Sequence, residues 1–525
     1  MIILGIGGLL NDAACALLKD GELLAAVEQK KVARRFQPGE LPADAIAACL
    51  RIARVQAADV NCVAIVRPFT SGPETAMHLS LRDTFPRAEV VVIEHHAAHA
   101  ASAYYASPFD QATVLTLDRT GDFRCGARWS AAGVDLKLEK ELYYPDSLGD
   151  LYGRVTELLG FQSNADEHKV QWLSASGDDQ YTELFQEILS PGQGGWPRLN
   201  RSFFDGDRRS SGGFSARFYR RLGLEDGAAI PEGKRAAVAS GLQHAVEKTV
   251  VQMAGSGENL CLAGGLALNV LLVAALERSG AWKNVFVQPA AGNAGTALGA
   301  VFHAWHHACG ESRRVRFDCL CLGVSFTAEE IKQVLENCKL RFRYLLTTGE
   351  TVDTAVREIQ DQKIIAWMHG RTEFGPRALG NRSILASPLN PYSTENLNVF
   401  IKHREPFRKF AASVPEEVVG DYFEVGPNAR FLATVGRVRP QHRKLFETAV
   451  LGDGLVRVHT VRRDENPLFW ELLQATGKVT GLPVLYNTSF NLFGDPLVST
   501  PRDAVRSFYS SGIDALFAGN FFLEK

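Results

Sequence analysis

The sequence of 525 residues lacks an excess of either charge, a paired-cysteine motif and a long hydrophobic run. Its 57 lysines and arginines nearly cancel its 59 aspartates and glutamates, so the composition predicts no nucleic-acid partner and no anionic membrane partner. No stretch reaches about 18 consecutive apolar residues, which argues against a membrane span. The nine cysteines are scattered, odd in number and without a CxxC pair, which argues against disulfides or a thiolate zinc site and favours a cytoplasmic protein.

A common nucleotide signature is also absent. No GxxxxGK(S/T) motif occurs, which argues against a P-loop enzyme. The apolar run at 1–10 is like the core of a signal peptide, but no basic residue precedes it, and Asn11 and Asp12 interrupt it. We therefore expect a buried strand at the start of the chain.

Strand-like and helix-like segments alternate along the chain, with turns of small residues between them. The pair Asp20-Gly21 lies between two apolar runs and predicts a β-hairpin. Later strands are expected at 90–93, 112–117, 260–263 and 285–288. This alternation predicts an α/β fold with sites at the carboxyl ends of strands, and it is compatible with an actin-like duplicated fold. Residues 160–235 are rich in glycine, serine and charge, which predicts long loops or insertions.

Three histidines gather at His95, His96 and His99, directly after an expected strand and at the start of a small-residue helix. Residues four apart share a helix face, so His95 and His99 can point at one ion while His96 points elsewhere. No glutamate follows His95, so the metalloprotease motif HExxH is absent and a third ligand is needed. The alternative is a helix start with one buried histidine bonded to the backbone and the others in water.

Asp118 is the candidate third ligand, because it ends the expected strand 112–117, where a carboxylate can project into the crevice of an open sheet. Two histidines and one carboxylate suit Fe(II), Mn(II) or Zn(II) and leave positions open for substrate. The alternative is that Asp118 only caps the turn that follows it.

Glycine turns and cations offer candidate anion sites. Gly264-Gly265 and Gly292–Gly295 lead into helix-like segments whose N–H groups could receive phosphate, although glycine also serves helix packing. Gly- and Pro-rich surroundings favour an oxyanion pocket for the cations Arg371, Arg377, Arg382, Lys402, Arg404, Arg408 and Lys409. Asn487 and Asn491 could form hydrogen bonds with a base edge or an amide of a ligand, or they could satisfy the backbone of a turn.

Four long segments carry a family resemblance: Gly370–Pro388, Lys402–Val414, Thr460–Pro467 and Leu485–Pro501. With the histidine segment, Asp118 and the two glycine turns, the chain resembles the NodU/CmcH-type O-carbamoyltransferases from residue 1 to about residue 520. The resemblance implies an actin-like (ASKHA) duplicated domain over 1–348 and a smaller YrdC-like α/β domain over 349–525.

In such enzymes the YrdC-like domain converts carbamoyl phosphate and ATP into carbamoyl adenylate, and the actin-like domain moves the carbamoyl group to a small-molecule acceptor. The implied cofactors are ATP, Mg²⁺ and Fe²⁺ or another divalent transition metal, the last held by His95, His99 and Asp118. Carbamoyl phosphate or the adenylate would lie against Arg377, Lys402, Arg408, Arg457 and Asn487, with Arg377 and Lys402 acting in catalysis. The nucleotide phosphate would lie against Lys169, Gly264, Gly265, Asn269 and Asn293.

Two positions in the transfer site depart from the family's pattern. The family usually has a histidine before Asp12, but this chain has Asn11, and an amide does not act as a general base near neutral pH. Either Asp12 or His96 replaces that base, or the acceptor is an amine that needs none, or the transfer step is altered or inactive. At Asn293 the family usually has a metal-binding aspartate, and an amide oxygen is a weaker ligand.

The sequence therefore predicts an ATP-dependent carbamoyltransferase of natural-product biosynthesis, acting on a small-molecule hydroxyl or amine. The alternatives are a diverged relative with a different final transfer step, a non-catalytic nucleotide-binding relative, and a metallohydrolase unrelated to carbamoyl chemistry. Loops such as 195–215 are expected to bind the acceptor. A homodimer is expected by its frequency among proteins.

Overall fold

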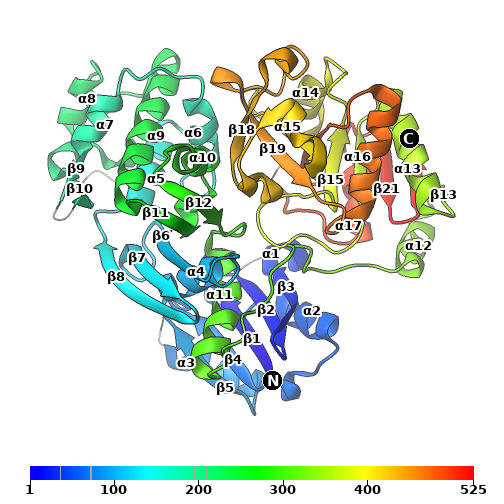
Figure 1. The fold of residues 1–525 in the computed structure, drawn as a ribbon, viewed down its shortest axis with the longest axis horizontal. Coiled ribbons are helices and arrows are strands. Elements are labelled where there is room, and N and C mark those ends of the chain that lie inside the picture. The colour runs from blue at the N-terminus through cyan, green and yellow to red at the C-terminus, as the bar shows by residue number, and fades with distance from the viewer. Residues whose placement is uncertain (36, 71, 73, 193–194, 208–210, 493) are drawn as a thin grey trace. The chain divides into compact units, whose positions relative to one another are not determined.

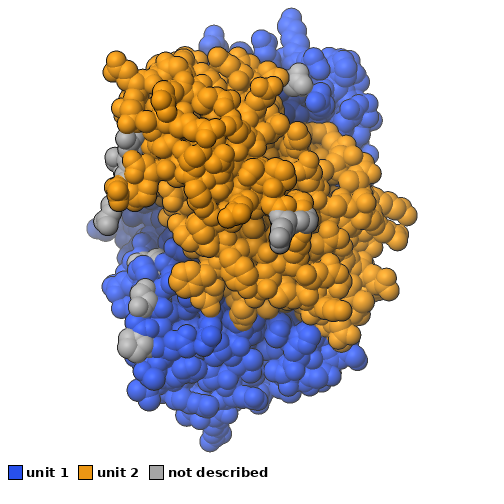
Figure 2. Space-filling model, turned by 90° about the vertical axis from the view of Figure 1, so that its left-hand side faces the viewer, with its two compact units in different colours: residues 1–93, 293–525 blue, residues 94–292 orange. Residues whose placement is uncertain are grey.

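Two five-stranded sheets with the same strand order occur in the first part of the chain (Figure 1). The structure is a computed structural model, and it describes all residues except 36, 71, 73, 193–194, 208–210 and 493, so part of the expected acceptor loop at 195–215 lies outside the described residues. The chain divides into a unit of residues 1–93 and 293–525 and a second unit of residues 94–292 (Figure 2).

The first sheet runs in the order β3-β2-β1-β4-β5. Its strands are β1 (Ile2–Gly7), β2 (Ala14–Lys19), β3 (Glu22–Glu28), β4 (Cys62–Val66) and β5 (Glu89–Ile93). The first three pair antiparallel, while β4 runs parallel to β1 and β5 parallel to β4. Asp20 and Gly21 both have positive φ, as a tight hairpin turn requires, so the predicted hairpin and the buried first strand are confirmed.

The second sheet repeats this topology in the order β12-β11-β6-β7-β8. Its strands are β6 (Gln111–Leu117), β7 (Arg124–Ala132), β8 (Asp135–Tyr143), β11 (Gly257–Ala263) and β12 (Trp282–Val287). Strands β6, β7 and β8 pair antiparallel, and β11 and β12 continue the sheet in parallel with β6. Strand β6 therefore takes the place of β1, and the repeat confirms the actin-like duplicated fold.

Glycines in β1 let a helix pack closely on the first sheet. The helices of this region are α1 (Gln29–Ala33), α2 (Ala43–Ala53), α3 (Glu74–Thr84) and α11 (Thr296–His303). A Cβ atom at Gly5 would lie 2.3 Å from the Ala297 carbonyl oxygen, and one at Gly7 would lie 2.2 Å from Thr296 Oγ1. The glycines of β1 are thus explained by the close approach of α11.

Residues 160–235 differ from the predicted long loops, because they contain helices. These are α6 (Glu167–Ser174), α7 (Thr182–Ile188), α8 (Ala216–Arg221) and the start of α9 (Glu232–Ala254), and α5 (Leu148–Leu158) precedes them. The short strands β9 (Leu189–Pro191) and β10 (Pro197–Leu199) pair between α7 and α8. Buried Phe185, Phe203, Phe214 and Phe218 contribute to the core here, so a few aromatics support helices in a stretch rich in glycine and serine.

A separate ten-stranded sheet occupies the C-terminal part, in the order β13-β22-β21-β14-β15-β20-β16-β19-β18-β17. Its strands are β13 (Arg343–Tyr344), β14 (Ile365–Met368), β15 (Arg382–Ala386), β16 (Ala411–Pro415), β17 (Phe423–Glu424), β18 (Val435–Val438), β19 (Leu455–Val461), β20 (Leu485–Ser489), β21 (Ala515–Ala518) and β22 (Phe521–Glu524). The predicted C-terminal α/β domain is confirmed, while the boundary between residues 348 and 349 stays a prediction.

Helices cover both faces of this sheet. They are α12 (Ala328–Asn337), α13 (Thr348–Gln360), α14 (Ser393–Glu395), α15 (Val419–Tyr422), α16 (Pro467–Thr480) and α17 (Pro501–Tyr509). One core contains residues of α13 and α16 with Trp367 and Leu485, and another contains residues of α12 and α17 with Ile384 and Tyr486. No helix in the described part of the chain has the length and apolar character needed to cross a membrane.

His459 of β19 makes this domain sensitive to acid. Its side chain is 3% exposed, and Nδ1 is hydrogen-bonded to Ser413 Oγ at 3.0 Å. Burial lowers the pKa of His459 to about 3, whereas a histidine in an unfolded chain has a pKa of about 6.5. Because the folded pKa is the lower one, the unfolded state binds more protons, and stability is lost as the pH falls from about 6.5 towards 3.

We expect His459→Gln to flatten this dependence by about 1.4 kcal/mol per pH unit between about pH 6 and about pH 4. Free energies of urea unfolding, measured at several pH values, give the slope. His244→Gln changes an exposed histidine of α9 and should keep the wild-type slope. Equal slopes for His459→Gln and the wild type would contradict the prediction.

Candidate functional site

The three histidines lie at the start of α4 (His95–Tyr104), which follows β5. Glu94 caps this helix, because its carboxylate accepts hydrogen bonds from the backbone N–H groups of His96 and Ala97. The helix therefore begins at His95, and His95 and His99 lie one turn apart on the same face.

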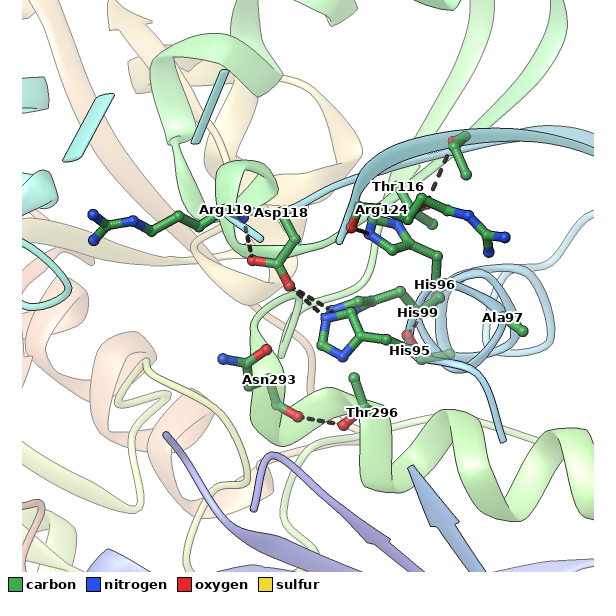
Figure 3. Close-up of polar contacts among 12 residues, drawn as sticks. His95, His96, Ala97, His99, Thr116, Asp118, Arg119, Arg124, Asn293 and Thr296 are labelled. Carbon is green, nitrogen blue, oxygen red and sulfur yellow. Dashed lines mark hydrogen bonds and ion pairs between the residues drawn. The ribbon is translucent and has the colours of Figure 1, made fainter. Parts of the chain in front are cut away.

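The side chains of His95 and His99 point at the carboxylate of Asp118, which follows β6 (Figure 3). His95 Nε2 lies 2.7 Å and His99 Nε2 lies 3.1 Å from the same oxygen, Asp118 Oδ2. The two Nε2 atoms are themselves 3.1 Å apart. Asp118 Oδ1 accepts a hydrogen bond from the backbone N–H of Arg119 at 2.8 Å. The structure thus brings the three predicted ligands together.

Burial and hydrogen bonding set the charge of this cluster. Burial acts to raise the pKa of the Asp118 carboxyl, but hydrogen bonds from His95 and His99 outweigh it and hold that pKa well below its usual value. Burial is also the main cause that lowers the pKa of His99. An ionised Asp118 and a neutral His99 imidazole are the forms in which these two groups bind a metal ion.

The donor set fits a divalent transition metal. Among the described residues, His95, His99 and Asp118 form the one group of three or more potential ligands whose donor atoms lie within 4.8 Å of one another. His96 lies outside this group: its Nδ1 is bonded to Thr116 Oγ1 at 2.8 Å and its Nε2 to the Arg124 carbonyl oxygen at 2.7 Å. His96 is therefore a buried histidine bonded to the backbone, as the alternative to a metal site predicted for one of the three. The other two histidines suit a metal site.

The turn at Gly264-Gly265 borders the Asp118 carboxylate. Gly264 has a φ of +94°, and a Cβ atom there would lie 2.1 Å from the Leu117 carbonyl oxygen, so the position requires glycine. A Cβ atom at Gly265 would lie 3.1 Å from Asp118 Oδ1. The backbone at this turn therefore comes close to the side chain that carries the negative charge of the cluster.

Two other residues predicted to bind the nucleotide phosphate have structural contacts. Asn269 caps α10 (Val270–Arg278), with Oδ1 accepting hydrogen bonds from the N–H groups of Leu271 and Leu272, and its Nδ2 donates to Gln243 Oε1. Lys169 forms an ion pair with Asp166 at 3.2 Å. Their phosphate-binding roles stay predictions.

Asn11 and Asp12 lie in the exposed turn between β1 and β2. The Asn11 N–H donates to the Gly8 carbonyl oxygen at 2.9 Å, and Asp12 forms an ion pair with Lys30 at 3.0 Å. Gly8 has a φ of +67°, and a Cβ atom there would lie 2.4 Å from the Asp12 carbonyl oxygen and 3.1 Å from that of Asn293. The turn therefore lies against the backbone of Asn293. The roles of Asn11 and Asp12 in transfer and of Asn293 in metal binding stay predictions.

The connection between β14 and β15 folds around a buried carboxylate. Glu373 is 1% exposed, and its Oε1 accepts hydrogen bonds from the N–H groups of Leu379 at 2.8 Å, Asn381 at 2.9 Å and Arg382 at 3.1 Å. These bonds close a lobe of residues 374–378, which carries Arg377. Sequence reasoning missed Glu373, and the available signal was a single acid in a segment that holds three arginines.

Two of those arginines stabilise the connection itself. Arg371 donates to the carbonyl oxygens of Leu24, Leu322 and Gly323 at 2.5–3.0 Å. Arg382 is 1% exposed and donates to the carbonyl oxygens of His369, Gly370 and Asn381. These contacts give Arg371 and Arg382 a structural role, and the oxyanion-pocket role expected for them stays a prediction.

Arg377, Arg404 and Arg408 lie near a fourth arginine, Arg457, on one face of the ten-stranded sheet. Asn487 of β20, Ala411 of β16 and Arg457 of β19 are direct partners across three strands, so their side chains share a face. Burial, and then repulsion from Arg377, Arg404 and Arg408, lowers the pKa of Arg457 well below its usual range. We call these four residues the arginine cluster; it contains three of the predicted phosphate ligands and adds Arg404.

Lys402 and Asn487 lie beside this cluster. Lys402 Nζ donates to the carbonyl oxygens of Ser489 and Asn491 and to Asn491 Oδ1 at 2.5–2.8 Å, which uses its three N–H groups. Burial, and then Arg404 and Arg408, lower the pKa of Lys402 well below its usual value. Asn487 Nδ2 donates to the Ala378 carbonyl oxygen and to Ser413 Oγ, whereas its buried Oδ1 has no hydrogen-bond partner among the described residues.

Known proteins share both parts of this arrangement. Residues 73–302 match the family model described as "Carbamoyltransferase N-terminus", and residues 356–525 match "Carbamoyltransferase C-terminus". An uncharacterised protein of Synechocystis sp. is 33% identical over 595 aligned residues, which cover 100% of this chain and 96% of that protein. Nodulation protein NolNO of Sinorhizobium fredii is 33% identical over 558 residues, which cover 98% of this chain and 79% of NolNO.

A shorter match carries an enzyme's name. The 3'-hydroxymethylcephem-O-carbamoyltransferase of Amycolatopsis lactamdurans is 29% identical over 269 residues, which cover 51% of this chain and 49% of that enzyme. The first family match includes His95, His99 and Asp118, which we call the histidine cluster. The second includes the arginine cluster. The resemblance predicted from the sequence is confirmed, and the chain belongs to the carbamoyltransferase family.

Proposed function

We propose that this protein makes carbamoyl adenylate from carbamoyl phosphate and ATP at the arginine cluster and transfers the carbamoyl group to a small-molecule acceptor in natural-product biosynthesis. The observation that carries the proposal is the alignment of Asn487, Ala411 and Arg457 across three strands, which sets a partly buried arginine beside an amide oxygen that has no partner among the described residues. In this reaction, water releases inorganic phosphate from carbamoyl phosphate and leaves carbamate. A carbamate oxygen then attacks the α-phosphorus of ATP, and pyrophosphate leaves.

The charges of the cluster suit these reactants. Burial lowers the pKa of Arg377 to about 10, and burial followed by repulsion from Arg408 lowers that of Arg404 to about 9. Cations that repel one another in a desolvated place are stabilised when an oxyanion enters between them. Carbamoyl phosphate and the ATP triphosphate are such anions, and fixed guanidinium groups also stabilise charge that develops as pyrophosphate leaves.

Asn487 supplies a contact specific to the carbamoyl group. Its Nδ2 is occupied by Ala378 and Ser413, so the amide orientation is fixed and Oδ1 is the open acceptor. A buried acceptor without a partner is costly unless a ligand donates to it. The carbamoyl NH₂ group is a donor that a plain phosphate or acetyl group lacks, so Asn487 favours a carbamoyl donor.

The transfer step is proposed for the histidine cluster. His95, His99 and Asp118 would hold a divalent transition metal, iron by the family resemblance, and such an ion supplies Lewis-acid stabilisation of the transferring group. Asp118 is oriented by the Arg119 N–H, and the Gly264-Gly265 turn brings backbone close to it, so these residues fix the ligand geometry. ATP would enter with Mg²⁺ at the adenylate-forming site.

Asp12 and His96 are the two candidate general bases for the acceptor. Asn11 cannot act as a general base, and both ring nitrogens of His96 are engaged. Asp12 pairs with Lys30 in an exposed turn and is the remaining candidate base. A more nucleophilic acceptor, such as an amine, is the second candidate, and Asn11 is the observation that favours it.

We expect carbamoyl phosphate and ATP together, but neither alone, to make the wild-type protein release pyrophosphate. Arg457→Gln should lower that rate about a hundredfold or more, because it removes a partly buried cation proposed to stabilise the developing charge. Arg437→Gln changes an exposed arginine on neighbouring β18 and should retain the wild-type rate. A coupled pyrophosphate assay measures all three proteins. Absence of pyrophosphate from the wild type would overturn the adenylation proposal.

We expect the wild-type protein to retain about one transition-metal ion per chain, and His99→Ala to lose it, because a two-ligand remnant binds weakly. Elemental analysis after dialysis measures the metal content, with His244→Ala as a control at an exposed histidine of the same unit. Retention of equal metal by His99→Ala and the wild type would show that the ligands lie elsewhere.

A further inference from the structure

We infer that Lys31, on the short N-terminal helix α1, is a positioning residue for Arg377, and this inference rests on the proposed function. Lys31 Nζ donates to the carbonyl oxygen of Glu373 at 2.9 Å and to that of Gly375 at 2.6 Å. It also forms an ion pair with Glu28. One of these contacts therefore holds Gly375 within the lobe 374–378, and another holds Glu373, whose side chain closes the lobe.

Glu28 completes this attachment. The Gly375 N–H donates to Glu28 Oε2 at 3.2 Å, so both backbone polar groups of Gly375 are bound by the N-terminal region. The side chains of Lys31 and Glu28 are only 12% and 17% exposed. Contacts of charged groups that are this well shielded are stronger than those of an exposed pair.

Gly375 is a position that needs outside support. Its φ of +101° is in a region that glycine reaches freely, and glycine has no side chain with which to pack. Arg377 follows two residues later, and its charge repels that of Arg457. A charged loop held against like charges keeps one geometry only when its backbone is anchored.

Each side of the Arg377 lobe has its own anchor. Glu373 binds the N–H of Leu379, and Asn487 binds the carbonyl oxygen of Ala378, both from within the C-terminal domain. The anchor at Gly375 comes instead from Lys31 and Glu28, more than three hundred residues earlier in the chain. The N-terminal region thus supplies part of the structure that presents Arg377 to carbamoyl phosphate.

Three variants of the full-length protein test this role. Lys31→Met removes the donor, Glu28→Gln with Lys31→Met removes both charges, and Lys30→Met is the matched control on the same helix, where Lys30 pairs with Asp12 instead. We measure KM and kcat for carbamoyl phosphate by pyrophosphate release, the melting temperature, and the affinity for inorganic phosphate by calorimetry.

We expect Lys31→Met to raise KM about tenfold, as loss of one charge-assisted hydrogen bond implies, and to lower the melting temperature. The double variant should recover melting temperature, because no unpaired charge remains, yet keep the raised KM. Lys30→Met should match the wild type in all measurements. Recovery of KM together with melting temperature, or an unchanged KM in Lys31→Met, would reduce Lys31 to a purely structural residue and overturn the inference.

Phosphate affinity separates this inference from the proposed function. If the wild type releases no pyrophosphate, the adenylation proposal fails, while Lys31→Met and the double variant should still bind inorganic phosphate about tenfold more weakly than the wild type. Equal phosphate affinities across all the proteins would overturn the positioning role.

Discussion

The desolvated arginine cluster is the constraint on which the C-terminal domain depends. Arg377, Arg404 and Arg408 lie close enough to Arg457 to lower its pKa, and such a group cannot be gathered by hydrophobic packing alone, because taking charge out of water costs free energy. The surrounding chain must hold them against that repulsion. If the cluster binds an anion, as proposed, the rigidity of its frame determines how well it does so.

The frame consists of polar groups that satisfy the backbone of one irregular connection. The stretch between β14 and β15 has few ladder partners, so its N–H and C=O groups need side chains instead. Glu373 accepts three N–H groups, while Arg382 and Lys31 together bind carbonyl oxygens along the connection. Each of these side chains is shielded from water, and each is matched by more than one partner. The connection is thus fixed by charge-assisted hydrogen bonds rather than by secondary structure.

Much of the fold and part of the site could be predicted, and the failures share one cause. The Asp20-Gly21 hairpin and the His95/His99 face follow from local rules of turn geometry and helix spacing, and both are confirmed. Arg371, Arg377 and Arg382 have the same chemistry and share one segment, so only tertiary contacts could separate Arg377 from the two arginines that bind carbonyl oxygens. Likewise, the helices within 160–235 depend on buried phenylalanines that average composition conceals.

One short helix, α1, contacts both the turn at Asn11-Asp12 and the loop that carries Arg377. On α1, Lys30 pairs with Asp12 in the turn where the family expects acceptor activation, and the next residue, Lys31, binds the loop that carries Arg377. Consecutive residues of a helix point in directions about 100° apart, so a helix of this length can serve two neighbours at once. Any displacement of α1 therefore changes both contacts together. In the proposed reaction the duplicated domain would thus have a second role, because its residues Glu28 and Lys31 hold the loop that carries Arg377.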